Sequence, residues 1–556
     1  MGTYLNPNKA AFQMAVNSEI FVDKTVMIQY LNSIINTQQR FVSVSRPRRF
    51  GKTMAADMIC AYYDRKAETH NLFERRKLAE CPSVYVGEQE IKWNTYLGKF
   101  DVLRIVMTDF MDEYKTVRDM IQYLTDEVTE EILEEYPDIQ VNNKIKLRTV
   151  MNKIFNKTGR QFVVVIDEWD AVFRERRNDT NGQKEYLDFL RDWMKDKPYI
   201  ALAYMTGILP IKKYGEHSAL NMFYEYSMIA PRQFASYTGF TEEEVKSLCV
   251  KYNMSYEEIS NWYDGYIINN RIPTEDREAY RAGKYEKHKI SIYNPLSVVN
   301  AMLNGTVENY WTKTETYEAL AEYIKKDYAG LQETVAILMN GGRIKISTSS
   351  YQNDMTTFNS KDDILTLLIH LGYLGYDDET GEVFIPNKEI LDEFKTSTES
   401  PEWVKAFKKL LDDSHEILEA IWALDEEKVA SLLEKAHDEV ENKTYNNEAA
   451  LNYAVQLALY AAKIYYTVLL ELDSGKGYID IAYLPIPKYP NLPALVIELK
   501  HDKTAETALT QIKKQQYPAR LEHYKGNILL VGIEYDKEVA NTSPKFKHHK
   551  CKIERA

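Results

Sequence analysis

A nine-residue stretch near the N-terminus, SRPRRFGKT (Ser45–Thr53), constrains the fold of this chain more than any other segment. It follows the apolar run FVSV (Phe41–Val44), which predicts a strand, and precedes Met54–Tyr63, which predicts a helix. A strand, a loop that ends in Gly-Lys-Thr and a helix are the context of a phosphate-binding P-loop. In such a loop, backbone N–H groups and the helix N-terminus surround the phosphates. The stretch therefore predicts an α/β domain with a nucleotide site.

The loop supplies the first candidate nucleotide-binding residues, which are Arg49, Phe50, Gly51, Lys52 and Thr53. We expect Lys52 to neutralise the β- and γ-phosphates and the Thr53 hydroxyl to bind Mg²⁺. One position departs from the usual GxxxxGK[ST] pattern, because Arg46 stands where the first glycine is expected. The alternative interpretation is a basic loop in front of an amphipathic helix.

A second apolar run, FVVVI (Phe162–Ile166), ends in Asp167 and Glu168, which is a Walker B pattern. A parallel strand buried on both faces is continuously apolar, and its carboxyl end is where an open α/β sheet binds its ligand. We expect Asp167 to hold Mg²⁺ and Glu168 to polarise the attacking water. A core strand capped by a solvated acidic turn is the alternative, but the combination with the P-loop favours ATP binding.

A third predicted strand, Ile200–Met205, ends in Thr206 and Gly207. A polar residue at the end of a strand beside Walker B can sense the γ-phosphate, so Thr206 is a further candidate. The alternative is that Thr-Gly only marks the change from strand to loop. The alternation of strands and helices predicts a doubly wound parallel α/β domain.

Together with FVDKT (Phe21–Thr25), SRPRRFGKT resembles the predicted AAA-ATPase family of bacteria and archaea, which typically carries a C-terminal PD-(D/E)XK nuclease-like domain. In that family an arginine commonly replaces the first P-loop glycine. Further similar segments are Ile208–Met228, WYDGY (Trp262–Tyr266) and YNPLSV (Tyr293–Val298). In YTGFTEEEV (Tyr237–Val245), Thr241 followed by Glu244 indicates a capping box at the start of a helix. The resemblance implies that FVDKT lies near the nucleotide, whereas its residues alone indicate a helix cap.

The C-terminal region holds a second cluster of candidate residues. Asp480 lies on one predicted strand, and Glu498 and Lys500 lie two apart on the next, so they share a face. Two carboxylates on adjacent strands can hold one or two divalent cations, and a lysine can orient the nucleophile. An amphipathic edge strand is the alternative.

The resemblance to PD-(D/E)XK nucleases adds roles to this cluster. It implies that Asp480, Glu498 and Lys500 are catalytic, with Mg²⁺ or Mn²⁺ bound by the two carboxylates. It also implies supporting positions at Glu448, Gln511 and Tyr517.

We expect five regions along the chain. They are a P-loop domain at 1–235, a helical lid at 236–300, a winged-helix-like region at 301–400, a helical linker at 401–445 and a nuclease-like domain at 446–556. In the middle region, the helix Lys361–Leu371 precedes a predicted hairpin whose acidic turn argues against DNA binding. The apolar window Ala449–Leu470 predicts a buried helix rather than a membrane span, because polar residues interrupt it.

Composition limits the partners. With 556 residues and a formal charge of −13, the chain is not a general binder of polyanions, so nucleic acid must contact local basic patches. We expect DNA in preference to RNA, and a homo-oligomer is compatible with the sequence. Four widely spaced cysteines and the lack of a signal-peptide pattern indicate a cytoplasmic protein.

The leading hypothesis is an ATPase whose nucleotide state regulates a Mg²⁺-dependent nuclease. One alternative is a nucleotide-driven switch whose C-terminal domain binds nucleic acid without cutting it. Another is an ATPase that recruits a protein partner and uses the nuclease fold as a scaffold. Metal-dependent cleavage, measured with and without ATP, separates these hypotheses.

Overall fold

The computed structural model divides into two compact units. It describes residues 2–556 except for 112–113, 115, 141–145, 215–216, 219, 274–284, 312–330, 340, 398–412, 439–450, 452–454, 457, 474–477, 487–488, 502–504, 515–520, 522–523, 525 and 537–547. The first unit comprises Met1–Gln332 and Arg343–Ser397, and the second comprises Glu333–Gly342 and Thr398–Ala556. The division into five regions stays a prediction.

A five-stranded parallel sheet forms the centre of the first unit. Its strand order is β4-β5-β6-β1-β9, and every neighbouring pair is parallel. The strands are β1 (Phe41–Ser45), β4 (Asp101–Val106), β5 (Phe162–Asp167), β6 (Ile200–Gly207) and β9 (Tyr224–Tyr226). Strands β1, β5 and β6 are buried along their whole length, which explains their continuously apolar sequences.

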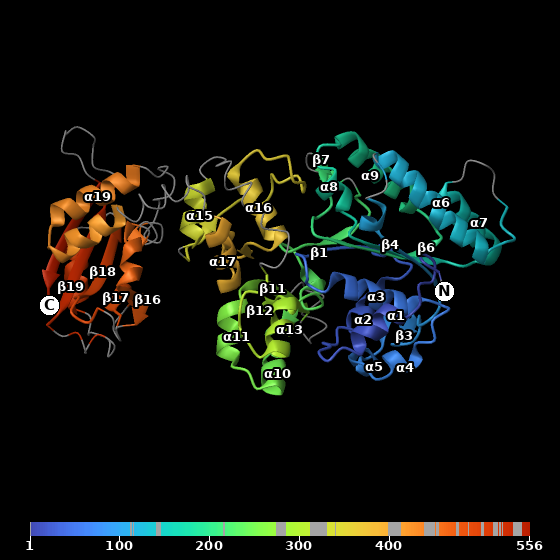
Figure 1. Cartoon of the computed structure of the whole chain (residues 1–556), viewed down its shortest axis with the longest axis horizontal. Helices are drawn as coiled ribbons and strands as arrows, with labels where there is room; N and C mark the ends of the chain where they lie inside the picture. The colour runs from blue at the N-terminus through green and yellow to red at the C-terminus, as the bar shows by residue number, and fades with distance from the viewer. Residues whose placement is uncertain are drawn as a thin grey trace. The chain divides into compact units, whose positions relative to one another are not determined.

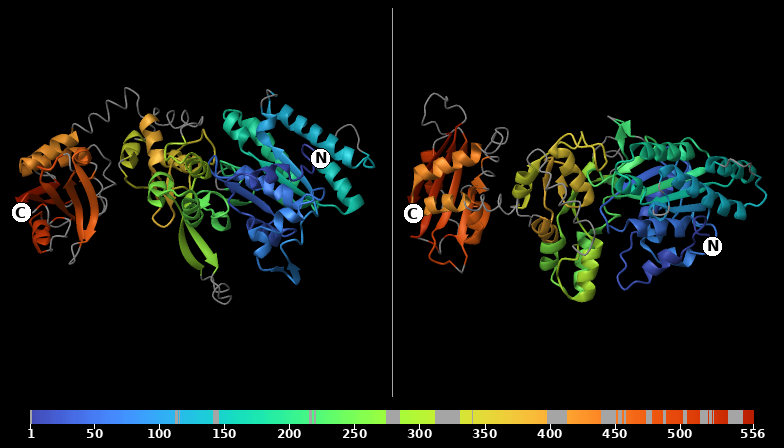
Figure 2. Two further views of the ribbon diagram at one scale, coloured as in Figure 1. Left: turned by 60° about the horizontal axis from the view of Figure 1, so that its bottom comes forward. Right: turned by 45° about the horizontal axis from the view of Figure 1, so that its top comes forward.

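Helices cover both faces of this sheet (Figures 1 and 2). On one side lie α1 (Ala10–Val16), α2 (Met27–Ile34) and α3 (Lys52–Tyr63). On the other side lie α6 (Val117–Glu135), α7 (Leu147–Thr158) and α9 (Thr180–Met194). The unit is therefore a doubly wound α/β fold, as predicted.

Shorter elements connect these layers. They are α4 (His70–Phe73), α5 (Lys77–Glu80), β2 (Val84–Val86), β3 (Gln89–Ile91), η1 (Met107–Phe110), α8 (Ala171–Glu175), β7 (Lys213–Tyr214), β8 (His217–Ser218) and η2 (Arg232–Phe234).

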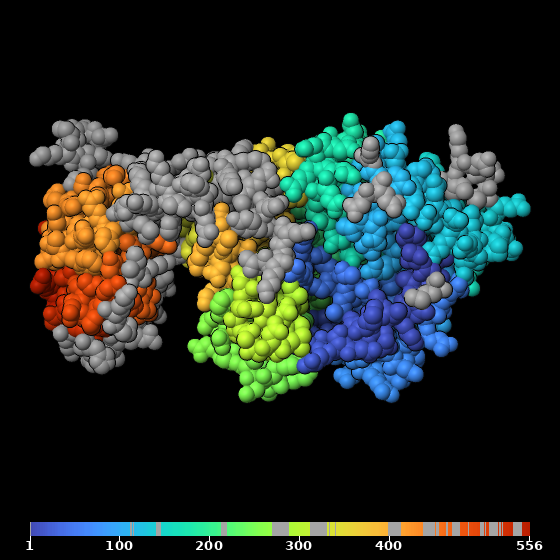
Figure 3. Space-filling model, viewed as in Figure 1, coloured from blue at the N-terminus to red at the C-terminus, as the bar shows by residue number. Residues whose placement is uncertain are grey.

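The region predicted as a helical lid contains a small sheet as well as helices. The helices are α10 (Glu242–Tyr252), α11 (Tyr256–Tyr263) and α13 (Pro295–Asn304), and the strands are β10 (Phe240–Thr241), β11 (Tyr266–Pro273) and β12 (Tyr285–Tyr293). The sequence analysis missed the hairpin of β11 and β12, because Asn269 and Asn270 interrupt its short apolar pieces. On the face shown in Figure 3, this region (green) adjoins the N-terminal segment (blue), and Ile20 packs in its apolar core.

The region predicted as winged-helix-like has the predicted order of helix, hairpin and helix, and its described elements lie in the last part of the first unit. These elements are α16 (Lys361–Leu371), β14 (Gly375–Asp377), β15 (Glu382–Phe384) and α17 (Lys388–Ser397), with β13 (Ile344–Lys345) paired to β15. Helix α15 (Leu331–Met339) belongs for the most part to the second unit.

The second unit contains a mixed five-stranded sheet in the order β16-β17-β18-β19-β20. The strands are β16 (Tyr466–Asp473), β17 (Tyr478–Pro485), β18 (Ala494–His501), β19 (Ile528–Tyr535) and β20 (His549–Arg555). Ile497 and Leu499 face an apolar core that includes residues of α19 (Glu426–Asp438). Leu509 of α21 (Ala505–Lys514) packs in a separate core with Val496 and Leu530.

The apolar window Ala449–Leu470 is not one helix. Residues Tyr460–Ile464 form the 3-10 helix η3, and β16 begins at Tyr466, so the end of the window pairs in the sheet instead. Among the described residues, no helix combines the length and apolar character that crossing a membrane requires. The four cysteines are free thiols.

Candidate nucleotide and nuclease sites

Three adjacent strands bring the predicted nucleotide residues to one edge of the first sheet. In the register of β1 and β6, Ser45 lies beside Gly207, and in that of β5 and β6, Ile166 lies beside Met205. The P-loop after β1, the acidic pair after β5 and the end of β6 therefore share this edge. Open α/β sheets bind their ligands at this carboxyl edge.

Two residues in the left-handed conformation shape the P-loop. Gly51 has a φ of 81° and is the N-cap of α3, and Arg49 has a φ of 69°. Glycine adopts this conformation without the steric penalty that a side chain meets. Such turns form concave backbone surfaces for anions, and the N-terminus of α3 adds the positive end of its dipole. The loop geometry therefore suits phosphate.

The arginine in place of the first P-loop glycine anchors the loop from behind. The buried guanidinium of Arg46 donates hydrogen bonds to the carbonyls of Ser45 (2.8 Å), Tyr226 (2.9 Å) and Phe234 (3.1 Å). These bonds tie the start of the loop to β9 and η2. Burial lowers the pKa of Arg46 to about 10, which leaves the side chain charged at neutral pH.

We expect Arg46→Met to destabilise the first unit by about 3 kcal/mol, because three buried carbonyls lose a charged donor. Calorimetry should show its melting temperature fall by several degrees. Arg48→Met is the matched control, since Arg48 lies two residues on and is only partly buried. Equal melting temperatures in the Arg46→Met protein and the wild type would contradict the anchoring role.

Lys52 is buried beside three carboxylates. Its ammonium donates a hydrogen bond to the Pro47 carbonyl (2.8 Å), so the side chain folds back over the loop. Burial lowers the pKa of Lys52, and the charges of Glu168, Asp167 and Asp170 oppose this effect. The P-loop lysine therefore lies next to the acidic residues that follow β5.

The two residues predicted to hold Mg²⁺ in this site are in contact. Burial raises the pKa of Asp167, and a hydrogen bond with the Thr53 side chain opposes this shift, as do the charges of Arg104 and Lys52. Arg104 Nη2 lies 3.7 Å from Asp167 Oδ2. The structure thus brings together a hydroxyl and a carboxylate at the start of α3, within reach of a phosphate bound by the loop.

Glu168, the candidate general base, is engaged in an ion pair. Its backbone has a φ of 52°, and its N–H donates to Asp167 Oδ1 (3.0 Å). Its carboxylate accepts a hydrogen bond from the guanidinium of Arg174 on α8. This pair must therefore loosen before Glu168 can polarise water effectively.

Asp170, the second acid after β5, has a structural role. It is fully buried, and its Oδ2 accepts hydrogen bonds from the N–H groups of Ile208 (3.1 Å) and Leu209 (2.8 Å). A Cβ at Gly207 would lie 2.4 Å from Asp170 Oδ1, so glycine is required there. Asp170 thus positions the chain that leaves β6.

Thr206, the candidate γ-phosphate sensor, lies inside the sheet. Its side chain is fully buried, and its carbonyl accepts a hydrogen bond from the Trp169 N–H (3.1 Å). Among the described residues, the Thr206 hydroxyl finds no hydrogen-bond partner. Thr206 is not one of the residues that line the cavity over the P-loop, and its sensing role stays a prediction.

That cavity has a volume of about 780 Å³. Its polar side is lined by Lys52, Thr53, Asp167, Glu168 and Arg174. The loop residues Arg48, Arg49, Phe50 and Gly51 also line it, as does Lys24 of FVDKT. Small-molecule sites have volumes of roughly 300–1,000 Å³, so the cavity is large enough for a nucleotide.

The cavity also has apolar lining residues, called here the apolar wall, which come from segments far apart in the chain. They are Phe12, Ile20, Phe21, Val22, Met54, Met58, Tyr237, Phe240, Leu296 and Val299. The resemblance had implied the position of FVDKT near the nucleotide. No chemistry had been assigned to the YTGFTEEEV and YNPLSV segments, which supply part of this wall. An apolar wall beside a phosphate-binding loop suits a nucleotide base.

The C-terminal candidate site lies where the ladder of β17 and β18 ends. The ladder ends at the pair Ile481 and Ile497, and the same register places Asp480 opposite Glu498 on one face. The Leu499 N–H donates to Asp480 Oδ2 (2.7 Å), and the Asp480 N–H donates to the Glu498 carboxylate. The two carboxylates are therefore neighbours at the end of the ladder.

Lys500 joins this pair from the same face of β18. Its ammonium lies 2.9 Å from Glu498 Oε1, and both side chains are buried. Burial raises the pKa of Glu498 to about 7, with a further contribution from the charge of Asp480, and Lys500 opposes the shift. A cation bound beside the two carboxylates would stabilise their charged forms.

Helix α21 packs beside this site. A Cβ at Gly532, which lies next to Glu498 in the register of β18 and β19, would be 2.6 Å from the Ala505 carbonyl. Glu534, next to Lys500 in that register, accepts a hydrogen bond from the Ala505 N–H (3.0 Å) and caps α21. Glu534 was not among the predicted site residues, because the helix that it caps is separate from β19 in the sequence.

Two family models match the chain. One, described as "Predicted AAA-ATPase", matches residues 11–215, and the other, described as "PD-(D/E)XK nuclease superfamily", matches residues 447–543. The chain combines a predicted AAA-ATPase domain with a PD-(D/E)XK nuclease superfamily domain. The two-part resemblance seen in the sequence is therefore confirmed.

Other comparisons add little to this assignment. No curated protein matches the chain. A structure of the Aeropyrum pernix ORC2 protein, titled as ADPNP-ADP complexes, is similar at 9% identity with a TM-score of 0.26, and the match covers 71% of this chain and 98% of that one. Because this score is too low to establish a shared fold, the fold assignment depends on the strand order above.

Among the described residues, neither domain shows a complete set of protein ligands for a metal. In the part of the chain that the structure describes, no three His, Cys, Asp or Glu side chains gather as metal ligands. Glu448, Tyr517 and the side chain of Gln511 lie outside the described residues. Mg²⁺ is commonly bound by one or two carboxylates, with phosphate oxygens and water completing its shell. Thr53 with Asp167, and Asp480 with Glu498, fit that pattern.

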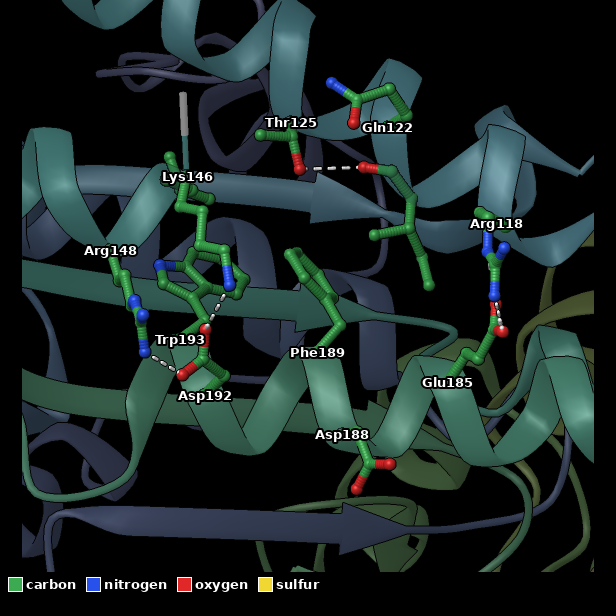
Figure 4. Close-up of a pocket in the computed structure, with 12 residues that line it drawn as sticks. Arg118, Gln122, Thr125, Lys146, Arg148, Glu185, Asp188, Phe189, Asp192 and Trp193 are labelled. Atoms are coloured by element: carbon green, nitrogen blue, oxygen red, sulfur yellow. Dashed lines mark hydrogen bonds and ion pairs between the residues drawn. The ribbon is translucent and has the colours of Figure 1, made fainter. Parts of the chain in front are cut away.

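The AAA-ATPase domain has a second cavity, of about 410 Å³, lined by residues of α6, the start of α7 and α9 (Figure 4). Arg118 pairs with Glu185, and Arg148 pairs with Asp192. Phe189 lies between these two pairs on α9 (Figure 4). Since these lining charges neutralise one another, we assign the cavity no ligand.

Proposed function

We propose that the AAA-ATPase domain binds and hydrolyses ATP with Mg²⁺, and that its nucleotide state regulates a Mg²⁺-dependent nuclease in the C-terminal domain. The observation that carries the first part is the convergence of Lys52, Thr53, Asp167 and Glu168 on one cavity. The second part is supported by the neighbouring carboxylates of Asp480 and Glu498 and by the nuclease family match.

In the ATPase site, the P-loop backbone and the N-terminus of α3 hold the phosphates. Lys52 supplies positive charge to the β- and γ-phosphates, while Thr53 and Asp167 would hold Mg²⁺. The bound ion neutralises charge that develops on the phosphate oxygens. Glu168 orients the attacking water and draws its proton away. The apolar wall of the cavity receives the base.

In the nuclease site, Asp480 and Glu498 would hold Mg²⁺, and Mn²⁺ suits the same oxygen ligands. A divalent ion held there would lower the pKa of a bound water and stabilise the phosphodiester transition state. Lys500 donates a hydrogen bond to the attacking oxygen or to the phosphate. The substrate is nucleic acid, with DNA favoured over RNA. The protein acts in the cytoplasm.

Glu168→Gln tests the catalytic half of this proposal. Glutamine keeps the shape of the side chain but cannot take a proton, so we expect ATP hydrolysis to slow by about 100-fold or more while ATP still binds. Single-turnover hydrolysis and calorimetry measure the two effects. Glu130→Gln is the control, because Glu130 is exposed on α6. Unchanged turnover would show that Glu168 is not the base.

The same Glu168→Gln protein tests regulation. Wild type and variant are incubated with Mg²⁺ or Mn²⁺ on linear, circular and single-stranded DNA, with and without ATP. Regulation predicts that the trapped ATP state changes the rate of cleavage. Binding of DNA without cleavage in any state would favour the switch alternative, and lack of DNA binding would favour recruitment of a protein partner.

A further inference from the structure

Arg174 is a buried cation in the ATPase cavity to which the P-loop and Walker B patterns assign no role. It lies on α8, six residues after Glu168, and its side chain is 9% exposed. It lines the cavity together with Lys52 and Asp167. The sequence analysis assigned no arginine to the γ-phosphate.

The guanidinium of Arg174 connects two acids with different roles. It donates a hydrogen bond to Glu168, the candidate base, and its Nε lies 3.2 Å from Oδ2 of the structural acid Asp170. Burial lowers the pKa of Lys52, and the charge of Arg174 adds a smaller contribution in the same direction. Arg174 therefore contacts the candidate base in the cavity that the phosphate-binding lysine also lines.

We propose that Arg174 binds the γ-phosphate of ATP in cis and releases Glu168 when it does so. This inference rests on the proposed ATPase function. A planar guanidinium with five donors matches phosphate oxygens well. A triphosphate brings several negative charges to the cavity, so it competes with Glu168 for the Arg174 guanidinium, while Asp170 holds the Nε side of the same group. ADP lacks the γ-phosphate and leaves the Arg174–Glu168 pair closed.

The arrangement links recognition of ATP to activation of the base. While Arg174 holds Glu168, the carboxylate oxygen that accepts from the guanidinium is occupied and is not available to a water molecule. Transfer of the guanidinium to the γ-phosphate frees the Glu168 oxygens for water. The nucleotide that can be hydrolysed is thus the one that frees the base.

The test compares the affinities of Arg174→Gln for ADP and for a non-hydrolysable ATP analogue, both with Mg²⁺, in the full chain. We expect the analogue to bind about 10- to 100-fold more weakly, as the loss of a charge-assisted contact implies, and ADP to bind within about twofold of wild type. Arg176→Gln is the matched control. Arg176 donates to the carbonyls of Met111 and Tyr114 and does not line the cavity. It should bind both nucleotides as wild type does.

The ratio of the two affinities separates a phosphate contact from a structural role. If Arg174 acts only by supporting Asp170 and the end of β6, both affinities fall together, and the inference is overturned. Unchanged affinity for the analogue also overturns it. If Arg174→Gln does not fold, Arg174→Lys replaces it, because lysine keeps the charge but loses the bidentate geometry. Its analogue affinity should then fall while its ADP affinity holds. A wild-type chain that binds neither nucleotide overturns the proposed function itself.

Discussion

Lys52→Ala is expected to weaken ATP binding by at least about 100-fold, because a charge-assisted contact with phosphate contributes roughly 1.5–3 kcal/mol and this lysine can make more than one. The side chain is buried over the P-loop beside the carboxylates of Asp167 and Glu168. Without the Lys52 charge, the repulsion between a bound triphosphate and these two carboxylates would be less well compensated. Titration calorimetry with ATP and ADP measures the loss, and ATP hydrolysis should disappear with it.

The control for this variant is Lys99→Ala, which removes an exposed lysine just before β4. Thermal melting should show that Lys52→Ala stays folded, since the ammonium donates to the Pro47 carbonyl of the loop itself and not to another element of the fold. Wild-type affinity in a folded Lys52→Ala protein would remove the basis of the P-loop assignment. A variant that loses ATP but keeps DNA cleavage would show that the nuclease does not need the nucleotide.

Much of the nucleotide edge could be predicted because its signals are local. The run Phe162–Ile166 followed by two acids has the sequence of a buried parallel strand, and β5 has those bounds to within one residue. The P-loop helix starts at Lys52, directly after Gly51 and two residues before the predicted start at Met54, and it ends at Tyr63 as predicted. Buried strands and glycine turns depend on a few neighbouring residues, so they can be recognised from a short stretch of sequence.

The role of Arg46 could not be predicted, because its partners are remote. Two of the three carbonyls that its guanidinium binds belong to Tyr226 and Phe234, about 180 residues away in the chain. The motif shows only that a glycine is missing. The same reason applies to Arg174, because its proposed role depends on where Glu168 and Lys52 lie in the folded cavity.

The apolar lining of the nucleotide cavity could not be predicted from the sequence either. Phe12 and Val299 line one cavity, although nearly 290 residues separate them. Neither residue differs from an ordinary core residue in its local pattern. In the nuclease domain, the shared face of Glu498 and Lys500 follows from the two-residue period of a strand. That Asp480 lies opposite Glu498 depends on the register of two strands, which the sequence does not state.

Asp480→Ala and Glu498→Gln are each expected to reduce metal-dependent DNA cleavage by about 1,000-fold or more, because a bound divalent ion supplies several kcal/mol of transition-state stabilisation. Each change removes one of the two carboxylates at the end of the β17–β18 ladder. Glutamine is chosen at Glu498 because it keeps the side-chain volume beside Lys500. Cleavage assays over a range of Mg²⁺ and Mn²⁺ concentrations, with calorimetry of metal binding, measure both effects.

Lys500→Ala should behave differently from the two carboxylate variants. Its ammonium contacts Glu498 and is placed to act on water or phosphate, so the ion should still bind while the chemical step slows. ATP hydrolysis should survive in all three variants, because the P-loop belongs to the other unit. Glu554→Gln, an exposed acid on β20, is the control and should cleave as wild type does. Cleavage that persists in the Asp480→Ala protein would exclude a metal shared by Asp480 and Glu498, since a hard cation with oxygen distances of about 2.0–2.6 Å needs both carboxylates close to it.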